Sequence, residues 1–421
     1  MKHSSYRNTP LKDSRPSVPS QAESASRSHG LDTLRSLAIL TVMAFHIYEL
    51  HAANTIPDVL LPVVRTCWMG VDLFFVLSGY LIGLQLLRPY AQGHQPSLAV
   101  FYLKRFFRVL PAYAVVLSLY LAVPLWREAP HLASPWEYYT FTENLFVHYP
   151  LERAFSHVWS LCVEEHFYLF LPLIVLLLTR RPSFAKTVTA VSFLVLLGIA
   201  IRGYVLLHSL QPMAERGESW FVVYVKQIYY PTYSRLDGLL TGVTLAILRT
   251  FRPAWWHRIA KRGHALLLSG IVLIAVAIYC SKDRAVSVTG IAAFGAVFAF
   301  PILSLGIGCI VASALSRNGV LSRIRIPGAK AVATLAYTLY LSHKGILHLT
   351  TIFFPAVSAA GGIRWTLLFL TSAFAASAIL YFVVERPFML LRDKLLHQRK
   401  PRGDSGRKPV IEDEVRAEPA L

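Results

Sequence analysis

Residues 31–50, LDTLRSLAILTVMAFHIYEL, have the length and the apolar character of a helix that crosses a membrane. Two side chains in this segment, Arg35 and His46, do not suit a surface in contact with lipid. They lie eleven residues apart, a spacing that returns to within about 20° of the same direction on an α-helix. The pattern therefore predicts a shared functional face, with about 16 Å between the two residues along the axis. The alternative is an arginine that reaches the lipid headgroups and a structural histidine.

The rest of the chain has the composition of a protein built from such segments. Its 421 residues are 55% hydrophobic with a mean hydropathy of +0.48, which is too apolar for a soluble protein of this size. Apolar runs recur at the length that a bilayer requires, so we predict an all-α polytopic membrane protein, a bundle of about ten transmembrane helices. The predicted segments are residues 31–50, 68–87, 109–126, 158–179, 187–208, 232–249, 264–280, 287–313, 332–354 and 364–385.

The basic residues indicate how these segments cross the membrane. The formal net charge is +19, but Lys and Arg concentrate in the two tails and in the loops after the second, fourth, sixth and eighth segments. This alternation is typical of cytoplasmic loops and not of a nucleic-acid-binding surface, so no nucleic-acid partner is expected. It predicts a multi-pass protein of the inner (plasma) membrane with both termini cytoplasmic and the loops 127–157 and 209–231 outside.

Three regions follow from the same patterns. Residues 1–30 are polar and rich in Ser, so we expect a disordered cytoplasmic tail and not a signal peptide. Residues 31–390 form the membrane domain, and residues 391–421 are expected to be a disordered basic cytoplasmic tail. The four cysteines have no spacing typical of a metal site or a disulfide framework, and no metal is expected.

The second and third segments each begin with unusual polar groups. In GVDLFFVLSGYLIG, Asp72 suits either substrate binding or helix capping, while Gly79 and Gly83 predict a smooth surface for close helix packing. In YLKRFFRVLPAY, Arg105 and Arg108 lie one turn apart at the expected cytoplasmic entrance of the third segment. Two guanidinium groups there suit a phosphate ligand, and contact with phospholipid headgroups is the alternative.

The fourth segment carries two adjacent carboxylates. In FSHVWSLCVEEHFYLFLPL, Glu164 and Glu165 follow Trp159 and precede Tyr168 in the expected outer third of the helix. Carboxylates at this depth require Arg, His or Tyr partners. Because the first and fourth segments run in opposite directions, one of the two glutamates can lie at the depth of His46. A carboxylate beside an imidazole fixes its tautomer and supports it as a general base.

Three later motifs have the same character. YSRLDGLLTG carries Arg235 and Asp237 at the expected outer start of the sixth segment. AYTLYLSHKGIL places His343 in the middle of the ninth segment. VVERPF places Glu385 at the cytoplasmic end of the tenth, where we expect a salt bridge with the basic pair of the third segment, and Pro387 is expected to end the helix.

Taken in order, the Arg35–His46 pair, GVDLFFVLSGYLI, KRFFRVLPAY, VWSLCVEEHFYLF, YSRLDGLLTG, YLSHKGIL and VERPF resemble the acyltransferase 3 family of integral membrane proteins over about residues 31–390. The resemblance implies O-acyl transfer, usually of acetyl from acetyl-CoA, to hydroxyls of carbohydrates or related molecules at the cell envelope. It also implies that Arg35 and His46 match the family's pair that is needed for activity. Arg105 and Arg108 match its arginine-rich motif.

This resemblance and the residues together suggest a mechanism. Acetyl-CoA is expected as the acyl donor at Arg105 and Arg108, His46 as the base, and Glu164 or Glu165 as the group that orients it, with direct transfer and an acyl-enzyme both open. The expected partners are acyl-CoA, a carbohydrate or lipid-linked glycan acceptor, and the lipid bilayer. Further substrate contacts are expected from Asp72, Trp159, Tyr168, Arg235, Asp237 and His343.

A function of another class is compatible with the same residues. Buried Arg, His and Glu side chains on several helices also occur in proton-coupled transporters, and a flippase of glycoconjugates is a related alternative. Internal inverted repeats would favour a transporter, and the sequence shows none that is clear.

Overall fold

The computed structural model describes residues 29–51, 56–147, 151, 153–179, 184–281, 289–316 and 318–398. Within these ranges the regular secondary structure is helical, which confirms the all-α class. The long helices are α1 (His29–His51), α3 (Gly70–Ala91), α4 (Leu98–Ala122), α6 (Trp159–Thr179), α7 (Phe184–Val205), α10 (Asp237–Phe251), α12 (Gly263–Ser281), α13 (Gly290–Ala314), α15 (Ala329–Phe353) and α17 (Gly362–Leu380). The shorter helices are α2 (Leu61–Val64), α5 (Pro135–Tyr139), α8 (Gln211–Glu215), α9 (Phe221–Tyr224), α11 (Pro253–Ala260), α14 (Val320–Arg323), α16 (Pro355–Ala360) and α18 (Arg386–Gln398).

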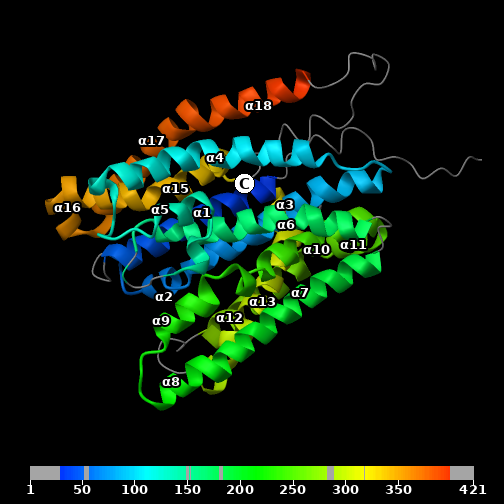
Figure 1. Ribbon diagram of the computed structural model, residues 1–421, viewed down its shortest axis with the longest axis horizontal. Helices are drawn as coiled ribbons and strands as arrows, with labels where there is room; N and C mark the ends of the chain where they lie inside the picture. The colour runs from blue at the N-terminus through cyan, green and yellow to red at the C-terminus, as the bar shows by residue number, and fades with distance from the viewer. Residues whose placement is uncertain are drawn as a thin grey trace, which may run out of the picture. The chain divides into compact units, whose positions relative to one another are not determined.

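Each of the ten predicted membrane segments coincides largely with one long helix. In the described part of the chain, eight helical stretches are long and apolar enough to cross a bilayer. The other two predicted segments are α10, which has 15 residues, and α15, which has 25 residues and buries several polar side chains. Both pack against other helices of the bundle, α10 against α3 and α13 and α15 against α1 and α17 (Figure 1).

Helices α3 and α10 pack very closely, and their glycines permit this approach. A Cβ atom at Gly79 of α3 would overlap the carbonyl oxygen of Leu239 on α10. In the opposite direction, a Cβ atom at Gly242 would overlap the carbonyl oxygen of Val76. Gly83 lies against the same helix. The predicted glycine surface is therefore confirmed, as expected where van der Waals packing drives helix association in lipid.

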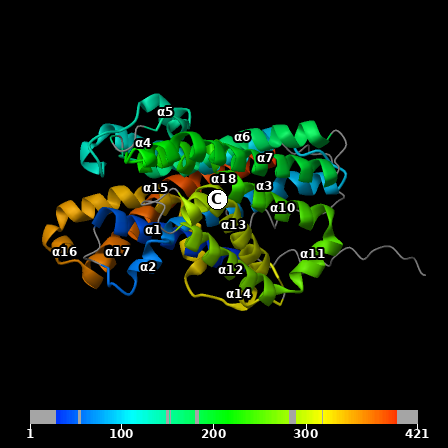
Figure 2. The same ribbon diagram turned by 90° about the horizontal axis from the view of Figure 1, so that it is seen from below.

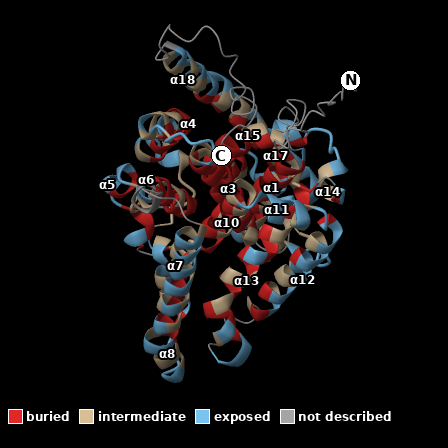
Figure 3. Ribbon diagram, turned by 90° about the vertical axis from the view of Figure 1, so that its right-hand side faces the viewer, coloured by how far each residue is buried: buried red, intermediate tan, exposed pale blue. Residues whose placement is uncertain are grey.

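Helix α1 buries one face against α3 and α15. The buried positions recur every three or four residues and are Leu31, Leu34, Arg35, Ala38, Ile39, Val42, Met43 and Ile47. Leu37 and Leu40 on the other side are exposed and suit contact with lipid. Arg35 and His46 both belong to the inward face, which confirms that they share one side of the helix. Figure 3 shows buried residues gathered on α1, α3 and α10, while most residues of α7, α8 and α12 are exposed or intermediate.

The connection between α4 and α6, predicted as a long loop, has an ordered structure of its own. Tyr138 of α5 is buried, and its Oη atom donates to the carbonyl of Ala154 at 3.2 Å. Tyr113 of α4 in turn donates to the carbonyl of Tyr138 at 2.8 Å. Figure 2 shows α5 close to α4 and α6. The connection thereby holds the residues before α6 in fixed positions at one end of the bundle.

Two boundaries differ from the prediction. Helix α4 begins at Leu98 with Ser97 as its N-cap, so Arg105 and Arg108 lie about two to three turns inside the helix and not at its entrance. From the sequence, Arg105 and Arg108 suggested a loop, because the buried groups that offset their charges lie in other segments of the chain.

The second difference concerns the end of the membrane domain. Pro387 does not end the helix, because a π-helical turn at Tyr381–Glu385 leads directly into α18. The π-helical turn before it adjusts the backbone hydrogen bonds that a proline interrupts, so the helix continues through Pro387. Residues 391–398, predicted as disordered tail, are therefore helical. The remainder of that predicted tail, and residues 1–28 of the other, lie outside the described residues.

The topology can be tested with single cysteines. A cysteine at Tyr139, which is 66% exposed on α5, should react with a membrane-impermeant thiol reagent in intact cells. A cysteine at Ser405 should react only after permeabilisation, because the alternating basic loops predict cytoplasmic tails. The unsubstituted chain is the control, because Cys67, Cys162 and Cys280 are buried and it measures any labelling of the partly exposed Cys309. The opposite labelling pattern would overturn the predicted orientation.

The glycine contact between α3 and α10 predicts a loss of stability in Gly242→Ala. Its new methyl group would meet the backbone of α3, and overpacking of this kind costs about 1–3 kcal/mol. Gly203→Ala on α7 is a matched control, because nothing lies within 4 Å of the added atom. Thermal unfolding of the purified proteins in detergent should show a lower Tm for Gly242→Ala alone. Equal Tm values for Gly242→Ala and the parent would contradict the close contact of Gly242 with α3.

Candidate active site

Helices α1 and α15 bring two histidines together in the interior. The Nδ1 atom of His46 and the Nε2 atom of His343 form a hydrogen bond of 2.8 Å. His157, at the end of the connection before α6, packs against both, with its ring centroid 5.0 Å from that of His343 and 6.1 Å from that of His46. His157 and His343 are fully buried. We call these three residues the histidine cluster; the sequence analysis named His46 and His343 but did not pair them.

A buried ion pair borders the histidine cluster. Lys344 follows His343 on α15, and its Nζ atom lies 3.3 Å from Oε1 of Glu128 and 3.1 Å from Oγ of Ser156. The connection between α4 and α6 therefore supplies the counter-charge for a lysine of α15. Sequence reasoning missed Lys344 and Glu128. The available signal was a lysine directly after His343 in a segment predicted to span the membrane.

The carboxylate beside His46 is Glu49. Its Oε2 atom lies 3.9 Å from Nε2 of His46, and its Oε1 atom accepts a hydrogen bond from Arg153 at 2.9 Å. The expectation that Glu164 or Glu165 occupies this place is wrong. Glu49 lies one turn after His46 on the same helix, so the i, i+3 spacing within residues 31–50 could have indicated it.

The paired glutamates of α6 belong to a different group of side chains. Glu164 accepts a hydrogen bond from Oη of Tyr168 at 2.7 Å, and this Oη atom also lies 2.5 Å from Oγ of Ser78. The guanidinium of Arg105 lies over the ring of Tyr168, 4.3 Å from its centroid, and its charge acts on both glutamates. One oxygen of Glu165, Oε1, is buried without a hydrogen-bond partner. The carboxylates are thus placed to balance the charge of Arg105.

The predicted salt bridge to the basic pair is confirmed for Arg108, which contacts Glu385. Both side chains are buried, so the pair joins α4 to the end of the π-helical turn after α17. Arg108 also experiences the positive charges of Arg105 and Arg35. We call Arg35, Arg105 and Arg108 the arginine cluster. Three buried guanidinium groups with planar donor geometry are suited to a phosphate or carboxylate ligand.

The arginine and histidine clusters lie toward opposite ends of one buried helix face. Arg35 belongs to the first and His46 to the second, and the eleven residues between them correspond to about 16 Å along α1. Arg35 is 2% exposed and lies 3.4 Å from Asp32, whereas His46 retains 12% exposure. The two clusters therefore have the charge and the spacing to contact opposite ends of an elongated molecule, an anionic group at Arg35 and a reactive group at His46.

The predicted pair of Arg235 and Asp237 is divided between two buried ion pairs. Arg235 binds Asp72 of α3 at 3.2 Å, and its guanidinium lies 3.7 Å from the ring centroid of Phe300 and 5.3 Å from that of Trp159. Arg235 therefore links Asp72 of α3 to Trp159 of α6. These contacts favour a structural role over the predicted contact with substrate.

Asp237 is engaged by an arginine that sequence reasoning missed. Arg202 of α7 makes a bidentate contact with Asp237, at 2.7 and 3.1 Å, and donates to the carbonyls of Ser234 and Val297 at 2.6 and 2.9 Å. The signal was an arginine inside the apolar run 187–208. This pair fixes α7 to the beginning of α10, and it too favours a structural role.

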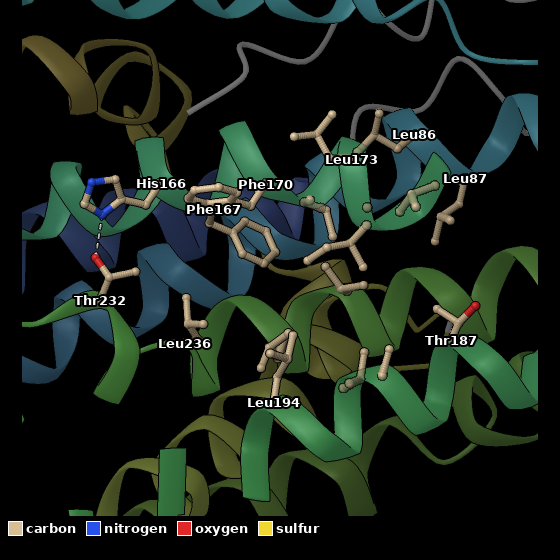
Figure 4. A pocket seen from close by; sticks show the side chains of 18 residues that line it. Leu86, Leu87, His166, Phe167, Phe170, Leu173, Thr187, Leu194, Thr232 and Leu236 are labelled. Carbon is tan, nitrogen blue, oxygen red and sulfur yellow. Dashed lines mark hydrogen bonds between the residues drawn. The ribbon is translucent and has the colours of Figure 1, made fainter. Parts of the chain in front are cut away.

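A cavity of about 470 Å³ lies between α3, α6, α7 and α10. Its lining is almost entirely apolar, with the hydrogen bond between His166 and Thr232 at one end and Thr187 at the other (Figure 4). Phe170 and Leu173 on its rim are exposed and continue the lipid-facing surface of α6. No member of the histidine or arginine cluster is among its lining residues. The cavity is therefore separate from the candidate active site.

Comparison with known proteins supports the resemblance on which these residues were selected. A family model described as an acyltransferase domain, that of the acyltransferase 3 family, matches residues 28–382. The O-acetyltransferase OatA of Staphylococcus aureus strain NCTC 8325 / PS 47 is 28% identical over 235 residues, which are 52% of this chain and 34% of that protein. The protein named "Putative O-acetyltransferase SACOL0978" of Staphylococcus aureus strain COL is 29% identical over 234 residues, which are again 52% of this chain and 34% of that protein.

The chain thus spans about one third of the length of the curated relatives that it matches. No solved structure matches it significantly. The family match covers nearly all of the described helices and includes every residue of the histidine and arginine clusters. Together with the polytopic helical fold, this match shows that the chain belongs to the acyltransferase 3 family.

Proposed function

We propose that the protein is a membrane O-acyltransferase that moves an acetyl group from acetyl-CoA in the cytoplasm to a hydroxyl group of an envelope or secreted carbohydrate. The observation that carries this proposal is the hydrogen bond between His46 and His343 in the interior of a chain of this family. An imidazole held in a defined orientation inside a membrane bundle is equipped for proton transfer. The names of the relatives support acetyl as the acyl group and oxygen as its acceptor.

The reaction needs one group that accepts and then returns a proton. In the proposed step, Nε2 of His46 takes the proton of the acceptor hydroxyl, and the hydroxyl oxygen attacks the thioester carbonyl carbon. The tetrahedral intermediate then collapses, the carbon–sulfur bond breaks, and the imidazolium returns its proton to the CoA sulfur. The products are the O-acetyl ester and free CoA. Glu49, 3.9 Å from Nε2, would stabilise the imidazolium between these two proton transfers.

The donor would lie along the buried face of α1. Its phosphates would contact the arginine cluster, where the family's arginine-rich motif and Arg35 come together. Its thioester would then reach toward His46 at the other end of the face. When no anion is bound, Glu164 and Glu165 would offset the positive charge of the arginine cluster, because they interact electrostatically with Arg105. This assigns the glutamates to the donor end of the site.

The acceptor would approach from the other end. Glu49, which lies 3.9 Å from Nε2 of His46, and its partner Arg153 retain 32% and 40% side-chain exposure, whereas the arginine cluster is buried. The proposed topology places this end outside, at the surface of the inner (plasma) membrane, with the basic tails in the cytoplasm. Donor and acceptor would thus reach His46 from opposite sides of the membrane.

A direct assay separates transfer from transport. Purified protein in proteoliposomes is supplied with acetyl-CoA and a glycan acceptor, and free CoA and ester formation are measured. Equal amounts of both are expected from an acyltransferase. Movement of the glycan across the bilayer without release of CoA would instead identify a transporter or flippase. Mass spectrometry of envelope glycans from cells with and without the protein would identify the acceptor.

His46→Ala should lower kcat by about 10²–10⁴-fold, the contribution typical of a general base. Arg35→Ala should also abolish most of the transfer, because it removes a member of the arginine cluster. Leu40→Ala is the matched control on α1, since Leu40 is exposed on the lipid-facing side. All three proteins should accumulate in the membrane to similar levels. Activity of His46→Ala within a few-fold of the parent would remove this residue from the mechanism.

The two arginines of α4 should respond differently to substitution. Arg105→Lys keeps the charge beside the glutamates but loses the planar guanidinium, so the KM for acetyl-CoA should rise. The loss of a hydrogen bond to a charged group, about 1.5–3 kcal/mol, corresponds to one to two decades in KM. The KM for the acceptor should not change. An unchanged KM for acetyl-CoA would show that Arg105 does not bind the donor.

Arg108→Ala should affect folding and is therefore compared with Arg105→Lys. It would leave Glu385 buried without its counter-charge, and breaking a buried pair costs about 3–5 kcal/mol. The expected result is therefore a lower Tm and less accumulated protein, in contrast to Arg105→Lys. Steady-state kinetics and thermal unfolding of both variants in parallel would separate donor binding from folding.

A further inference from the structure

We propose that His343 is a positioning residue that holds His46 in the tautomer with its proton on Nδ1, so that Nε2 carries the reactive lone pair. The sequence analysis had assigned His343 only to substrate contact. The inference rests on the proposed function, in which His46 is the base. It adds the identity of the group that prepares the base and names the nitrogen atom that reacts.

The argument begins at the backbone of α15. Nδ1 of His343 lies 2.8 Å from the carbonyl oxygen of Tyr340 and 3.0 Å from that of Leu339. A carbonyl oxygen only accepts hydrogen bonds, so Nδ1 of His343 must carry the proton. A neutral imidazole has one protonated nitrogen, and the other is an acceptor. Nε2 of His343 is therefore an acceptor.

The same reasoning then fixes the proton on His46. Nδ1 of His46 is 2.8 Å from Nε2 of His343, and a hydrogen bond between them requires one donor. Since Nε2 of His343 accepts, Nδ1 of His46 must donate. In the neutral ring of His46, the lone pair is left on Nε2, the nitrogen that faces Glu49. The direction of the hydrogen bond between His46 and His343 thus follows from the two carbonyls at Nδ1 of His343. His46 also has a backbone hydrogen bond with Val42, one turn earlier on α1.

Burial maintains the neutral form of His343 on which this argument depends. The ring is fully buried, and the neighbouring charge of Lys344 is already met by Glu128. A second positive charge at His343 would therefore be buried without a counter-charge, which is strongly unfavourable. The remaining member of the cluster does not compete for His46, because Nε2 of His157 lies 3.4 Å from the carbonyl of Leu341.

The arrangement has the logic of other catalytic histidines, in which a second group holds the ring in one tautomer. Here a neutral imidazole takes the role that a carboxylate commonly has. It orients the ring without placing a further negative charge in the membrane interior, where an unpaired charge is costly. Glu49, near the exposed end, provides the negative charge that the imidazolium needs after proton uptake.

Three substitutions at His343 test the role. In His343→Gln, the Oε1 atom is the same number of bonds from Cα as Nε2 of histidine, so it can accept the hydrogen bond from His46. In His343→Asn the oxygen is one bond too close to the backbone, and in His343→Ala no acceptor remains. We expect kcat to fall by about 10²-fold in the Ala and Asn variants, the lower end of what a general base contributes. The Gln variant should retain most of the activity, and KM for acetyl-CoA should change little in all three.

His348→Ala is the matched control, because His348 lies on the same helix outside the histidine cluster and is half-buried. Its activity should equal that of the parent. Thermal unfolding of each variant shows whether the fold is retained. Equal losses in folded Gln and Ala variants, or an Ala variant as active as the parent, would overturn the role of His343 as hydrogen-bond acceptor. If His46 is not the base, the His46→Ala protein will be active, and this outcome is distinct from the results at His343.

A spectroscopic measurement on the unsubstituted site keeps the proposal testable if a variant fails to fold. In protein labelled with ¹⁵N-histidine, the ring nitrogen shifts distinguish the two neutral tautomers. The signal of His46 is assigned by its disappearance in His46→Gln. We expect a protonated Nδ1 and an unprotonated Nε2 in the parent protein, and a mixture of tautomers in His343→Ala. A protonated Nε2 on His46 in the parent would overturn the inference.

Discussion

A charged side chain in the interior of a membrane bundle is tolerated only where the fold brings a counter-charge to it. In the described part of the chain, this constraint is met largely by buried pairs between segments that are distant in sequence. The pairs are Arg108–Glu385, Arg235–Asp72, Arg202–Asp237 and Lys344–Glu128. Breaking such a pair costs more than the pair itself contributes, because an unpaired charge remains in the interior. The ion pairs therefore determine which helices can be neighbours.

The same constraint separates structural charges from functional ones. Arg202 and Arg235 each have a carboxylate and further contacts with carbonyls or aromatic rings, which leaves little capacity for a ligand. The arginine cluster differs, because the positive charges of Arg35 and Arg105 both act on Arg108. Glu385 and the glutamates of α6 offset this repulsion in part. An anionic donor would offset it further, which links binding to the stability of this end of the bundle.

Several elements could be predicted from local pattern alone. The ten apolar runs, the inward face of α1 and the glycine contact of α3 follow from the spacing of residues within one helix. The start of α4 and the continuation through Pro387 could not be predicted in this way. In both places, charged or helix-breaking residues are accommodated by groups elsewhere in the chain, by Glu385 for Arg108 and by the π-helical turn for Pro387.

The candidate site shows the same division. Sequence reasoning selected His46, Arg35, Arg105, Arg108 and the glutamates of α6, but it paired His46 with the wrong carboxylate. Glu164 has Tyr168 one turn away on its own helix and the charge of Arg105 nearby, and these hold it at the other end of the site.

The sequence by itself determined the helices, their inward faces and the residue types at the site, because these depend on spacing along one chain segment. The tertiary structure alone decided that His46 meets His343 and not Glu164 or Glu165, and that Lys344 meets Glu128. Those pairings depend on the rotation and depth of separate helices, to which no local pattern is sensitive. A difference of one residue turns a helical side chain by about 100°, so a choice between neighbouring carboxylates is made only when the helices pack.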